Sequence, residues 1–315
     1  MRIALLCSTR RGYQSLKHLY HLAPESEFLV FSFKETPWEP PFFDDIRQFT
    51  ESINGSFFKA RQIEADKWSH LWDSTLIDLM LAVNWRYIIP PDVYSQARLG
   101  TFAFHDSLLP KYRGFSPTVW AIINGEDHTG VTLFEISENF DEGDIVDQEI
   151  VPIGSDDTIA VVFEKVTSAY IRLLEKNLQM LLSGTAPRHP QKHEDATYCC
   201  KRFPEDNKID WAQPTKRIYN LIRAVTSPYP GAFTYHKGRK LLVWSAALGT
   251  QDERYVGRVP GRVIKASPND GVEVLTGDGS LVLKSVQLEG VEESLAPHEI
   301  IRFGETLGQE KNTDA

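Results

Sequence analysis

The sequence has few sulfur-containing residues and no long apolar segment. Its 315 residues include three cysteines, Cys7, Cys199 and Cys200, and three methionines. An odd cysteine count with an adjacent pair does not form a disulfide framework or a zinc site, so we expect a protein of the reducing cytoplasm. No apolar run reaches the roughly 18 residues that a membrane-spanning helix needs, so we expect no membrane association. The N-terminal apolar run ends without a small-residue cleavage site and predicts a first strand, not a signal peptide.

Positive charge is also scarce. The chain has 34 Lys and Arg against 43 Asp and Glu, a formal charge of −9. Residues 1–200 carry 18 basic and 28 acidic residues, whereas residues 201–315 carry 16 and 15. Because binding to a phosphate backbone requires clustered basic side chains, this balance argues against a nucleic-acid partner. The simpler interpretation is that the acidic half is a solvated surface.

What is present is ordinary for a folded protein. Hydrophobic residues make up 42% of the chain and charged residues 24%, which excludes intrinsic disorder and a collagen-like structure. The length fits one large domain or two modest ones, and it allows a substantial core.

The first part of the chain alternates short apolar runs with helical patterns. Strands are expected at residues 2–7, 27–33, 78–84, 101–105, 131–137 and 144–151. Helices are expected at residues 13–21, 44–53, 65–75, 91–97, 117–124 and 159–182. Such alternation favours right-handed βαβ units. We therefore predict an α/β fold for residues 1–184, with a Rossmann-like, mostly parallel sheet and helices on both faces.

The pattern changes after residue 184. Residues 185–205 are polar, contain proline and histidine, and are predicted to form a linker. An amphipathic helix is expected at residues 216–226, followed by short strands at 233–236, 240–245, 261–265, 271–275 and 280–285. Short strands separated by Gly, Asp and Pro turns are typical of small barrels. Residues 206–315 are therefore predicted to form a small C-terminal β-barrel domain, OB-like in type.

In an open α/β sheet, ligands bind beyond the carboxyl ends of the strands. Residues 7–12 follow one such strand but match neither a GxGxxG nor a Walker pattern, so a dinucleotide or P-loop site is disfavoured. The richest candidate loop begins at His105, and an acidic loop with Asp141 joins two later apolar runs. Asp141 is placed to pair with His105 or to order a water. The alternatives are a structural histidine and a simple turn or cation-binding loop.

Two long segments resemble a known family. Residues 104–145, FHDSLLPKYRGFSPTVWAIINGEDHTGVTLFEISENFDEGDI, are similar to the signature of the N10-formyltetrahydrofolate-dependent formyltransferases. Residues 202–244, RFPEDNKIDWAQPTKRIYNLIRAVTSPYPGAFTYHKGRKLLVW, resemble the C-terminal portion of the methionyl-tRNA enzyme. They resemble even more the formyltransferase half of the bifunctional UDP-4-amino-arabinose enzyme. The resemblance implies N10-formyltetrahydrofolate as cosubstrate and a mechanism that requires no metal.

The family mechanism uses an Asn, a His and an Asp. The resemblance implies His105 and Asp141 for the last two, but the position two residues before His105 holds Ala103. Loss of an oxyanion donor typically costs on the order of 100–1,000-fold in rate. Three explanations stay open: another group replaces the donor, the chain is a variant of low activity, or His105 serves alone. We favour Asn84, or a water, as the replacement.

The resemblance also implies the binding residues. Those expected to hold the folate are Trp85, Arg86, Tyr87, Ile88, Leu109, Gly114 and Asp141. Those expected to hold the acceptor substrate are Arg10, Lys111, Arg113, Lys201 and Arg202. The basic members suit phosphate groups, although a solvated loop explains some of them equally well.

Charge decides between the acceptors of this family. The tRNA enzyme usually carries a basic, glycine-containing insertion, whereas the matching residues 33–45, FKETPWEPPFFDD, have one lysine and four acids. We therefore expect a UDP- or dTDP-linked amino deoxysugar as acceptor, in surface-glycan synthesis such as that of lipopolysaccharide. Initiator Met-tRNA is the second candidate, and a catalytically weak folate or sugar-nucleotide binding protein is the third. By analogy with the sugar enzymes we expect a homodimer.

Overall fold

The computed structural model describes residues 1–37, 39–61, 63, 76–250 and 254–310. It contains two compact units. The first consists of residues 1–117, 128–152 and 163–200, and the second of residues 118–127, 153–162 and 201–315. Most of the predicted linker, residues 185–200, therefore belongs to the first unit. The helix predicted at residues 65–75 lies outside the described residues.

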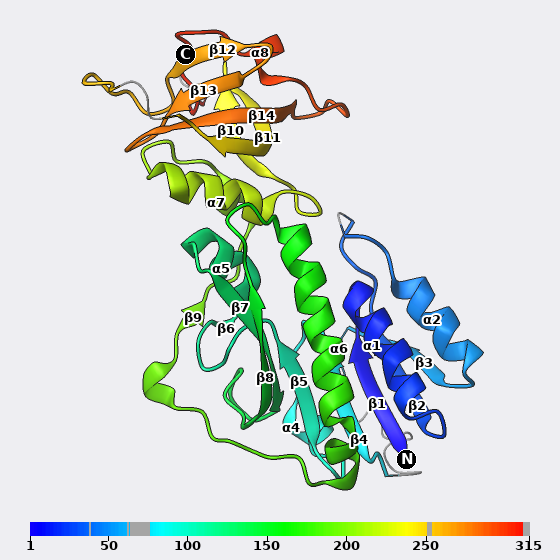
Figure 1. Cartoon of the computed structure of the whole chain (residues 1–315). Helices are drawn as coiled ribbons and strands as arrows, with labels where there is room; N and C mark the ends of the chain where they lie inside the picture. The colour runs from blue at the N-terminus through cyan, green and yellow to red at the C-terminus, as the bar shows by residue number, and fades with distance from the viewer. Residues whose placement is uncertain (38, 62, 64–75, 251–253, 311–315) are drawn as a thin grey trace. The chain divides into compact units, whose positions relative to one another are not determined.

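A seven-stranded sheet forms the centre of the first unit (Figure 1). Its strand order is β3-β2-β1-β4-β5-β7-β8, and neighbours run parallel from β3 to β5, whereas β7 and β8 are antiparallel. The strands are β1 (Arg2–Cys7), β2 (Glu27–Ser32), β3 (Ser56–Lys59), β4 (Leu79–Val83), β5 (Thr101–His105), β7 (His128–Glu135) and β8 (Ile145–Pro152). The predicted α/β class with a mostly parallel sheet is confirmed.

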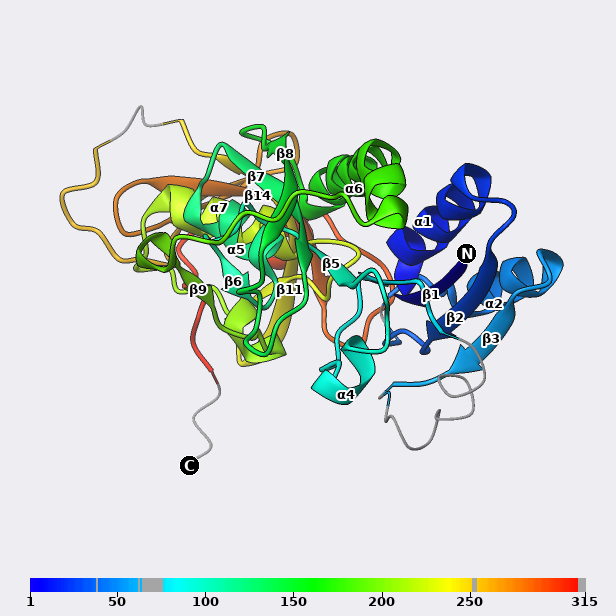
Figure 2. The same ribbon diagram turned by 90° about the horizontal axis from the view of Figure 1, so that it is seen from below.

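Helices cover both faces of this sheet, with α1 and α6 on one face and α4 on the other (Figure 2). The described helices up to residue 183 are α1 (Thr9–Leu22), α2 (Phe43–Ser52), α4 (Pro91–Tyr94), α5 (Pro117–Asn124) and α6 (Ile159–Ser183). Side chains of β1 alternate between the faces, as the period of two in a strand requires. Leu6 packs in the same core cluster as Val93 of α4. On the opposite face, a Cβ at Gly12 of α1 would lie 2.8 Å from Cys7 Cβ, so close packing there requires glycine.

Three features differ from the sequence prediction. Helix α1 begins at residue 9, four residues earlier than expected, and Ser8 occupies the N-cap position without a side-chain hydrogen bond to the helix. Strand β3 has no counterpart in the prediction, since its four residues acquire strand geometry by pairing with β2. The short strands β6 (Arg113–Gly114) and β9 (Tyr198–Cys199) pair in parallel, and β9 lies within the predicted linker. A 3-10 helix, His193–Asp195, also lies in that region, and another, Pro204–Asn207, crosses its C-terminal end.

The second unit is built on a five-stranded antiparallel sheet of order β10-β11-β14-β13-β12 (Figure 1). Its strands are β10 (Ala232–His236), β11 (Arg239–Leu248), β12 (Val263–Ser267), β13 (Gly271–Leu275) and β14 (Ser280–Leu288). Helix α7 (Thr215–Val225) packs on this sheet, and α8 (Pro297–Ile300) follows β14. This arrangement agrees with the predicted small barrel-like domain, while the OB-like type stays a prediction.

Segments from the middle of the chain complete the second unit. Arg217 of α7 donates to Asn124 Oδ1 at 2.8 Å, and Arg223 donates to the carbonyl oxygen of Asp157 at 2.8 Å. Residues 118–127 and 153–162 therefore share polar contacts with α7. Over the described parts of the chain, we find no helix long and apolar enough to cross a membrane.

Candidate active site

His105 is the last residue of β5 and is buried. Its Nε2 lies 2.8 Å from the carbonyl oxygen of Tyr112. A carbonyl oxygen only accepts hydrogen bonds, so Nε2 carries the hydrogen. The other ring nitrogen, Nδ1, faces Asp141 Oδ2 at 3.6 Å. The structure therefore brings together the His and the Asp that the sequence singled out, with Nδ1 as the nitrogen nearest the carboxylate.

Asp141 is held in place by its own main chain and by Gly114. Its φ of +55° lies in the left-handed region, where aspartate is among the tolerated residues. Its Oδ2 accepts a hydrogen bond of 2.8 Å from the amide of Gly114. One carboxylate oxygen thus faces both an amide donor and the imidazole, and it is oriented to accept a proton on that side.

Gly114 occupies a position that only glycine fits. Its φ is +98°, and a Cβ there would lie 2.6 Å from the carbonyl oxygen of Cys199. This close approach comes from the pairing of β6 with β9. Burial, and next the neighbouring Cys200, raise the pKa of the Cys199 thiol to about 12, so this thiol is not a nucleophile near neutral pH.

Arg113 and Gln191 hold the acidic loop. Arg113 is fully buried, and its guanidinium donates to Gln191 Oε1 at 2.7 Å and to Glu142 Oε1 at 2.9 Å. The Gln191 amide in turn donates to the carbonyl oxygens of Asp141 and Gly143, each at 2.8 Å. The sequence assigns Arg113 to substrate binding, but its buried guanidinium instead orders the loop that carries Asp141. Sequence reasoning misses Gln191, since no local pattern marks a glutamine in a polar stretch.

The main chain of Leu109 is fixed from both sides. Its amide donates to the hydroxyl of Thr132 at 3.0 Å, and its carbonyl oxygen accepts from the Gln148 amide at 2.9 Å. Its side chain is buried. These contacts hold the loop that follows His105, and they are side-chain contacts from β7 and β8 that the sequence pattern does not indicate.

Asn84 follows β4 and has a φ of +53°. Its side-chain nitrogen Nδ2 donates to the hydroxyl of Thr9 at 2.8 Å. Its main-chain carbonyl oxygen accepts a hydrogen bond of 2.8 Å from the hydroxyl of Ser8. One hydrogen on Nδ2 is thus bonded to Thr9, and the second is available to another acceptor. Ala103 on β5 is half-buried and packs against the core cluster, so it offers no polar group.

The segment after Asn84 combines aromatic packing with unused donors. The rings of Trp85 and Tyr87 pack edge-on against Phe33, with centroids 5.3 and 4.9 Å away. Among the described residues, Trp85 Nε1 is buried without a hydrogen-bond partner, and no acceptor lies against the main-chain amides of Tyr87 and Ile88. Ile88 is 66% exposed. This strand end has donors and apolar surface for a heterocyclic ligand.

Arg86, the remaining residue of that segment, forms a bidentate pair with Glu39, with one contact of 2.8 Å. Burial raises the pKa of the Glu39 carboxyl, but the hydrogen bonds and charge of Arg86, together with hydrogen bonds from Thr36, outweigh it, and the net pKa is lowered. The guanidinium of Arg86 is therefore tied to the loop after β2.

The other expected substrate-binding residues lie on both units. In the first unit, Arg10 pairs with Glu164 on the surface and Lys111 is exposed. In the second unit, Lys201 lies 5.6 Å from the ring centre of Phe203. Arg202 lies over Trp120 at 4.8 Å and donates to Asn207 Oδ1 at 2.8 Å. Burial lowers the pKa of the Arg202 guanidinium.

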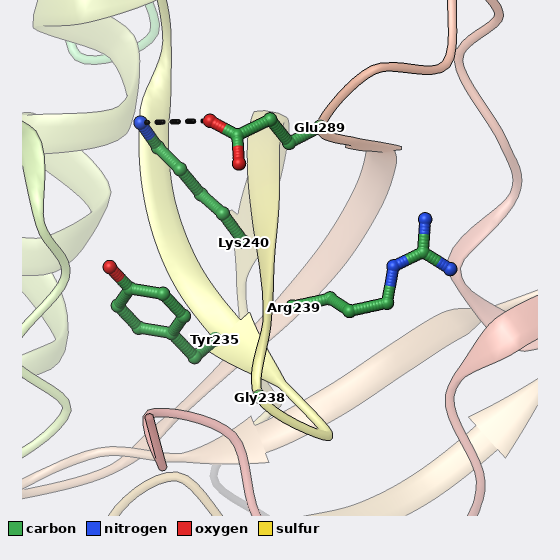
Figure 3. Close-up of a pocket in the computed structure, with 5 residues that line it drawn as sticks. All are labelled: Tyr235, Gly238, Arg239, Lys240 and Glu289. Atoms are coloured by element: carbon green, nitrogen blue, oxygen red, sulfur yellow. Dashed lines mark ion pairs between the residues drawn. The ribbon is translucent and has the colours of Figure 1, made fainter. Parts of the chain in front are cut away.

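A surface hollow in the second unit contains none of these residues. It is lined by Tyr235, Gly238, Arg239, Lys240 and Glu289 around the turn between β10 and β11 (Figure 3). Its Lys240 and Glu289 are 3.6 Å apart and neutralise each other's charge. For the part of the chain that the structure describes, no cluster of His, Cys, Asp and Glu is arranged to hold a metal.

The sequence matches two family models. Residues 17–178 match the formyl transferase model, and residues 202–300 match the model of the formyl transferase C-terminal domain. The first match covers the β5 end and both loops that carry His105 and Asp141.

Solved structures with the same fold include HypX from Aquifex aeolicus in complex with tetrahydrofolic acid, with 24% identity and a TM-score of 0.61. The alignment covers 95% of this chain and 46% of HypX, so the chain spans about half the length of that protein. The N-formyltransferase from Helicobacter canadensis, solved with folinic acid and dTDP-3-aminofucose, has 19% identity and a TM-score of 0.68. There the alignment covers 89% of this chain and 98% of the relative.

A third similar structure is that of WlaRD, a sugar 3N-formyl transferase in the presence of dTDP and 5-N-formyl-THF. It has 18% identity and a TM-score of 0.65, and the alignment covers 92% of this chain and 98% of WlaRD. At these identities the structures establish the shared fold alone, whereas the first family model covers residues 17–178, more than half of the chain. Together with the pairing of His105 and Asp141, this match shows that the chain belongs to the formyl transferase family.

Proposed function

We propose that this protein transfers a formyl group from N10-formyltetrahydrofolate to the primary amine of a nucleotide-linked amino deoxysugar. The observation that carries the transfer chemistry is the placement of His105 Nδ1 3.6 Å from Asp141 Oδ2 at the carboxyl end of β5. A titratable pair of this kind can move protons during acyl transfer near neutral pH.

The two residues take complementary roles in this scheme. The acceptor amine attacks the formyl carbon, a C–N bond forms, and the carbonyl oxygen becomes an oxyanion. In the resting enzyme His105 carries its hydrogen on Nε2, bound to Tyr112; once the ring takes up a second proton on Nδ1, that proton stabilises the oxyanion. Asp141 accepts the proton that the attacking ammonium loses, directly or through water. The oxyanion then re-forms the carbonyl, the bond to N10 breaks, and N10 takes the proton that Asp141 accepted.

The end of β4 supports a folate site. Trp85 Nε1 and the amides of Tyr87 and Ile88 are donors without acceptors among the described residues, and a pterin ring has nitrogen and oxygen acceptors for them. The three structural relatives named above were solved with folates, which supports a folate as the ligand. Leu109 and Gly114 are assigned to the same site, since both border the loops of His105 and Asp141.

Asn84 is proposed to replace the donor that Ala103 lacks. Its second amide hydrogen is not used by Thr9. The β4–β5 register pairs Ala82 with Ala103, so Asn84, just after β4, and His105, at the end of β5, each lie two residues further on. A hydrogen-bond donor at Asn84 restores part of the rate that is lost when an oxyanion contact is missing.

The choice of acceptor rests on charge and on two of the structural relatives. Two of them were solved with dTDP or a dTDP-linked amino sugar, and a doubly charged nucleotide needs only one or two basic contacts. Arg10 and Lys111, both in the first unit, are assigned to this ligand. Met-tRNA needs a basic track along its backbone, which a chain of charge −9 does not favour. A surface-glycan pathway, a cytoplasmic location and a homodimer are part of the same proposal.

An acceptor screen tests the proposal. The purified protein is given N10-formyltetrahydrofolate, and tetrahydrofolate release is followed by absorbance with UDP- and dTDP-linked 3-amino and 4-amino deoxysugars and with Met-tRNA. We expect turnover with one sugar. Turnover with Met-tRNA alone would overturn the sugar assignment. Folate binding without turnover on any acceptor would favour the binding-protein alternative and direct attention to Ala103.

A further inference from the structure

A buried polar network lies directly behind His105. Asp106, the next residue, forms an ion pair through Oδ2 with Arg11 of α1. Its other oxygen, Oδ1, accepts a hydrogen bond from the hydroxyl of Tyr170 on α6. One carboxylate therefore joins two helices to the end of β5, on the helical face that α1 and α6 share (Figure 2).

Tyr170 contacts both chain neighbours of His105. Its hydroxyl oxygen lies 3.3 Å from the carbonyl oxygen of Phe104, and its ring stacks on the Phe104 ring with centroids 4.8 Å apart. The carbonyl oxygen of Asp106 accepts a 3.1 Å hydrogen bond from the hydroxyl of Thr129. The main chain is thus fixed immediately before and immediately after the imidazole.

Burying these charged and polar groups costs free energy that a merely structural role does not explain. Arg11 and Tyr170 are both buried, and the Arg11 guanidinium lies over the Phe163 ring at 4.5 Å and over the Tyr170 ring at 5.5 Å. Burial, and next the charge of Asp106, raise the pKa of the Tyr170 hydroxyl well above its usual value, so it stays a donor. A buried ion pair often contributes less to stability than an apolar replacement, so its position next to His105 needs another reason.

We propose that Asp106, Arg11 and Tyr170 are positioning residues for His105. By clamping the end of β5, they place Nε2 on the Tyr112 carbonyl oxygen and turn Nδ1 toward Asp141. None of the three contacts the reacting atoms. The expected effect on kcat rests on the proposed formyl transfer. The expected effect on the orientation of the His105 ring does not depend on that function.

Tyr170→Phe is the primary test, because it removes one hydroxyl and keeps the ring. We expect kcat to fall about tenfold while the KM values of both substrates stay unchanged, since only the alignment of His105 is loosened. The matched control is Tyr20→Phe, because Tyr20 packs against Phe28 and Phe49 away from β5. We expect the control to keep full activity. An unchanged kcat in Tyr170→Phe would overturn the inference.

A second readout does not need turnover. In protein labelled with 15N-histidine, the ring nitrogens of His105 report which one carries the hydrogen, and the native form should be the Nε2–H tautomer. We expect Tyr170→Phe to move these signals toward a mixed population and Tyr20→Phe to leave them unchanged. Unchanged His105 signals in Tyr170→Phe would refute positioning. Shifted signals in a protein that never formylates any acceptor would sink the proposed function and leave the positioning intact.

Arg11 gives an independent check by conservative rescue. Arg11→Met leaves the Asp106 carboxylate buried without its cation, whereas Arg11→Lys keeps a positive charge at that place. We expect the native His105 tautomer to be retained better in Arg11→Lys than in Arg11→Met. Equal tautomer populations in both would contradict a role for the ion pair. If Arg11→Met does not fold, Tyr170→Phe still decides.

Discussion

His105 is the residue on which the proposed chemistry depends most. We expect His105→Asn to lower kcat by roughly 100-fold or more, because the asparagine cannot deliver and recover a proton near neutral pH. The thermal unfolding temperature should change little, since an amide can still donate to the Tyr112 carbonyl oxygen. His21→Asn on exposed α1 surface is the control. A kcat equal to wild type would show that His105 is not catalytic.

Ala103 and Asn84 make a second prediction at the residue scale. If Asn84 provides the missing donor, Asn84→Ala should lower kcat by on the order of 100-fold. The variant also loses the hydrogen bond to Thr9, which is worth about 1 kcal/mol of stability. Thr9→Val removes that hydrogen bond alone and is the matched control. Equal losses of kcat in the two variants would mean that Asn84 acts only by holding the β4 end.

The reciprocal variant, Ala103→Asn, completes that test. An asparagine two residues before His105 restores the family arrangement, so it should recover activity in the Asn84→Ala background. Its failure to do so, with an unchanged unfolding temperature, would argue that the oxyanion is stabilised by His105 alone.

At the scale of elements, the pairing of β6 with β9 is the feature that Gly114→Ala tests. The new Cβ would meet the Cys199 carbonyl oxygen, and the φ of +98° strains any other residue. We expect a loss of about 1–3 kcal/mol in the free energy of unfolding, measured by urea titration. The activity should fall as well, since the Gly114 amide holds Asp141.

Gly290→Ala separates the two causes of that loss. Gly290 has a φ of +81°, and a Cβ added there would meet no atom within 4 Å, so this variant reports the backbone strain alone. The difference between the two variants measures the clash with β9. If both lose the same free energy, the close approach of Gly114 to Cys199 contributes nothing.

The elements that the sequence predicts are those with a local signal. Residues 79–83 form a fully buried strand, as their continuous apolar run indicates, and α5 ends before Gly125, as that glycine indicates. The pairing of β6 with β9 and the contacts of Gln191 have no such signal, because two-residue strands and single polar side chains have no periodicity. A motif identifies His105 and Asp141, whereas the role of Arg113 depends on burial that no motif reveals.

At the scale of the whole molecule, the sequence indicates two parts but not how the chain is shared between them. Residues 118–127 and 153–162 lie among first-part segments in sequence, yet they belong to the second unit. Their partners on α7 are distant in sequence, and Asn124 is 93 residues from Arg217. Local patterns do not report contacts at such separations, so a boundary drawn at a composition change misses them.

This interleaving predicts that the first unit does not fold as an independent fragment. A chain ending at residue 200 keeps residues 118–127 and 153–162 but lacks α7, so Asn124 and the Asp157 carbonyl oxygen lose their arginine donors. Apolar side chains of α5 such as Val119 and Ile122, buried in the complete chain, keep fewer partners. We expect aggregation on size-exclusion chromatography or an unfolding temperature several degrees lower. A chain ending at residue 310 retains every described residue and is the control. A monodisperse, active fragment 1–200 would show instead that α5 and the start of α6 fold without α7, and that the small domain is dispensable for catalysis.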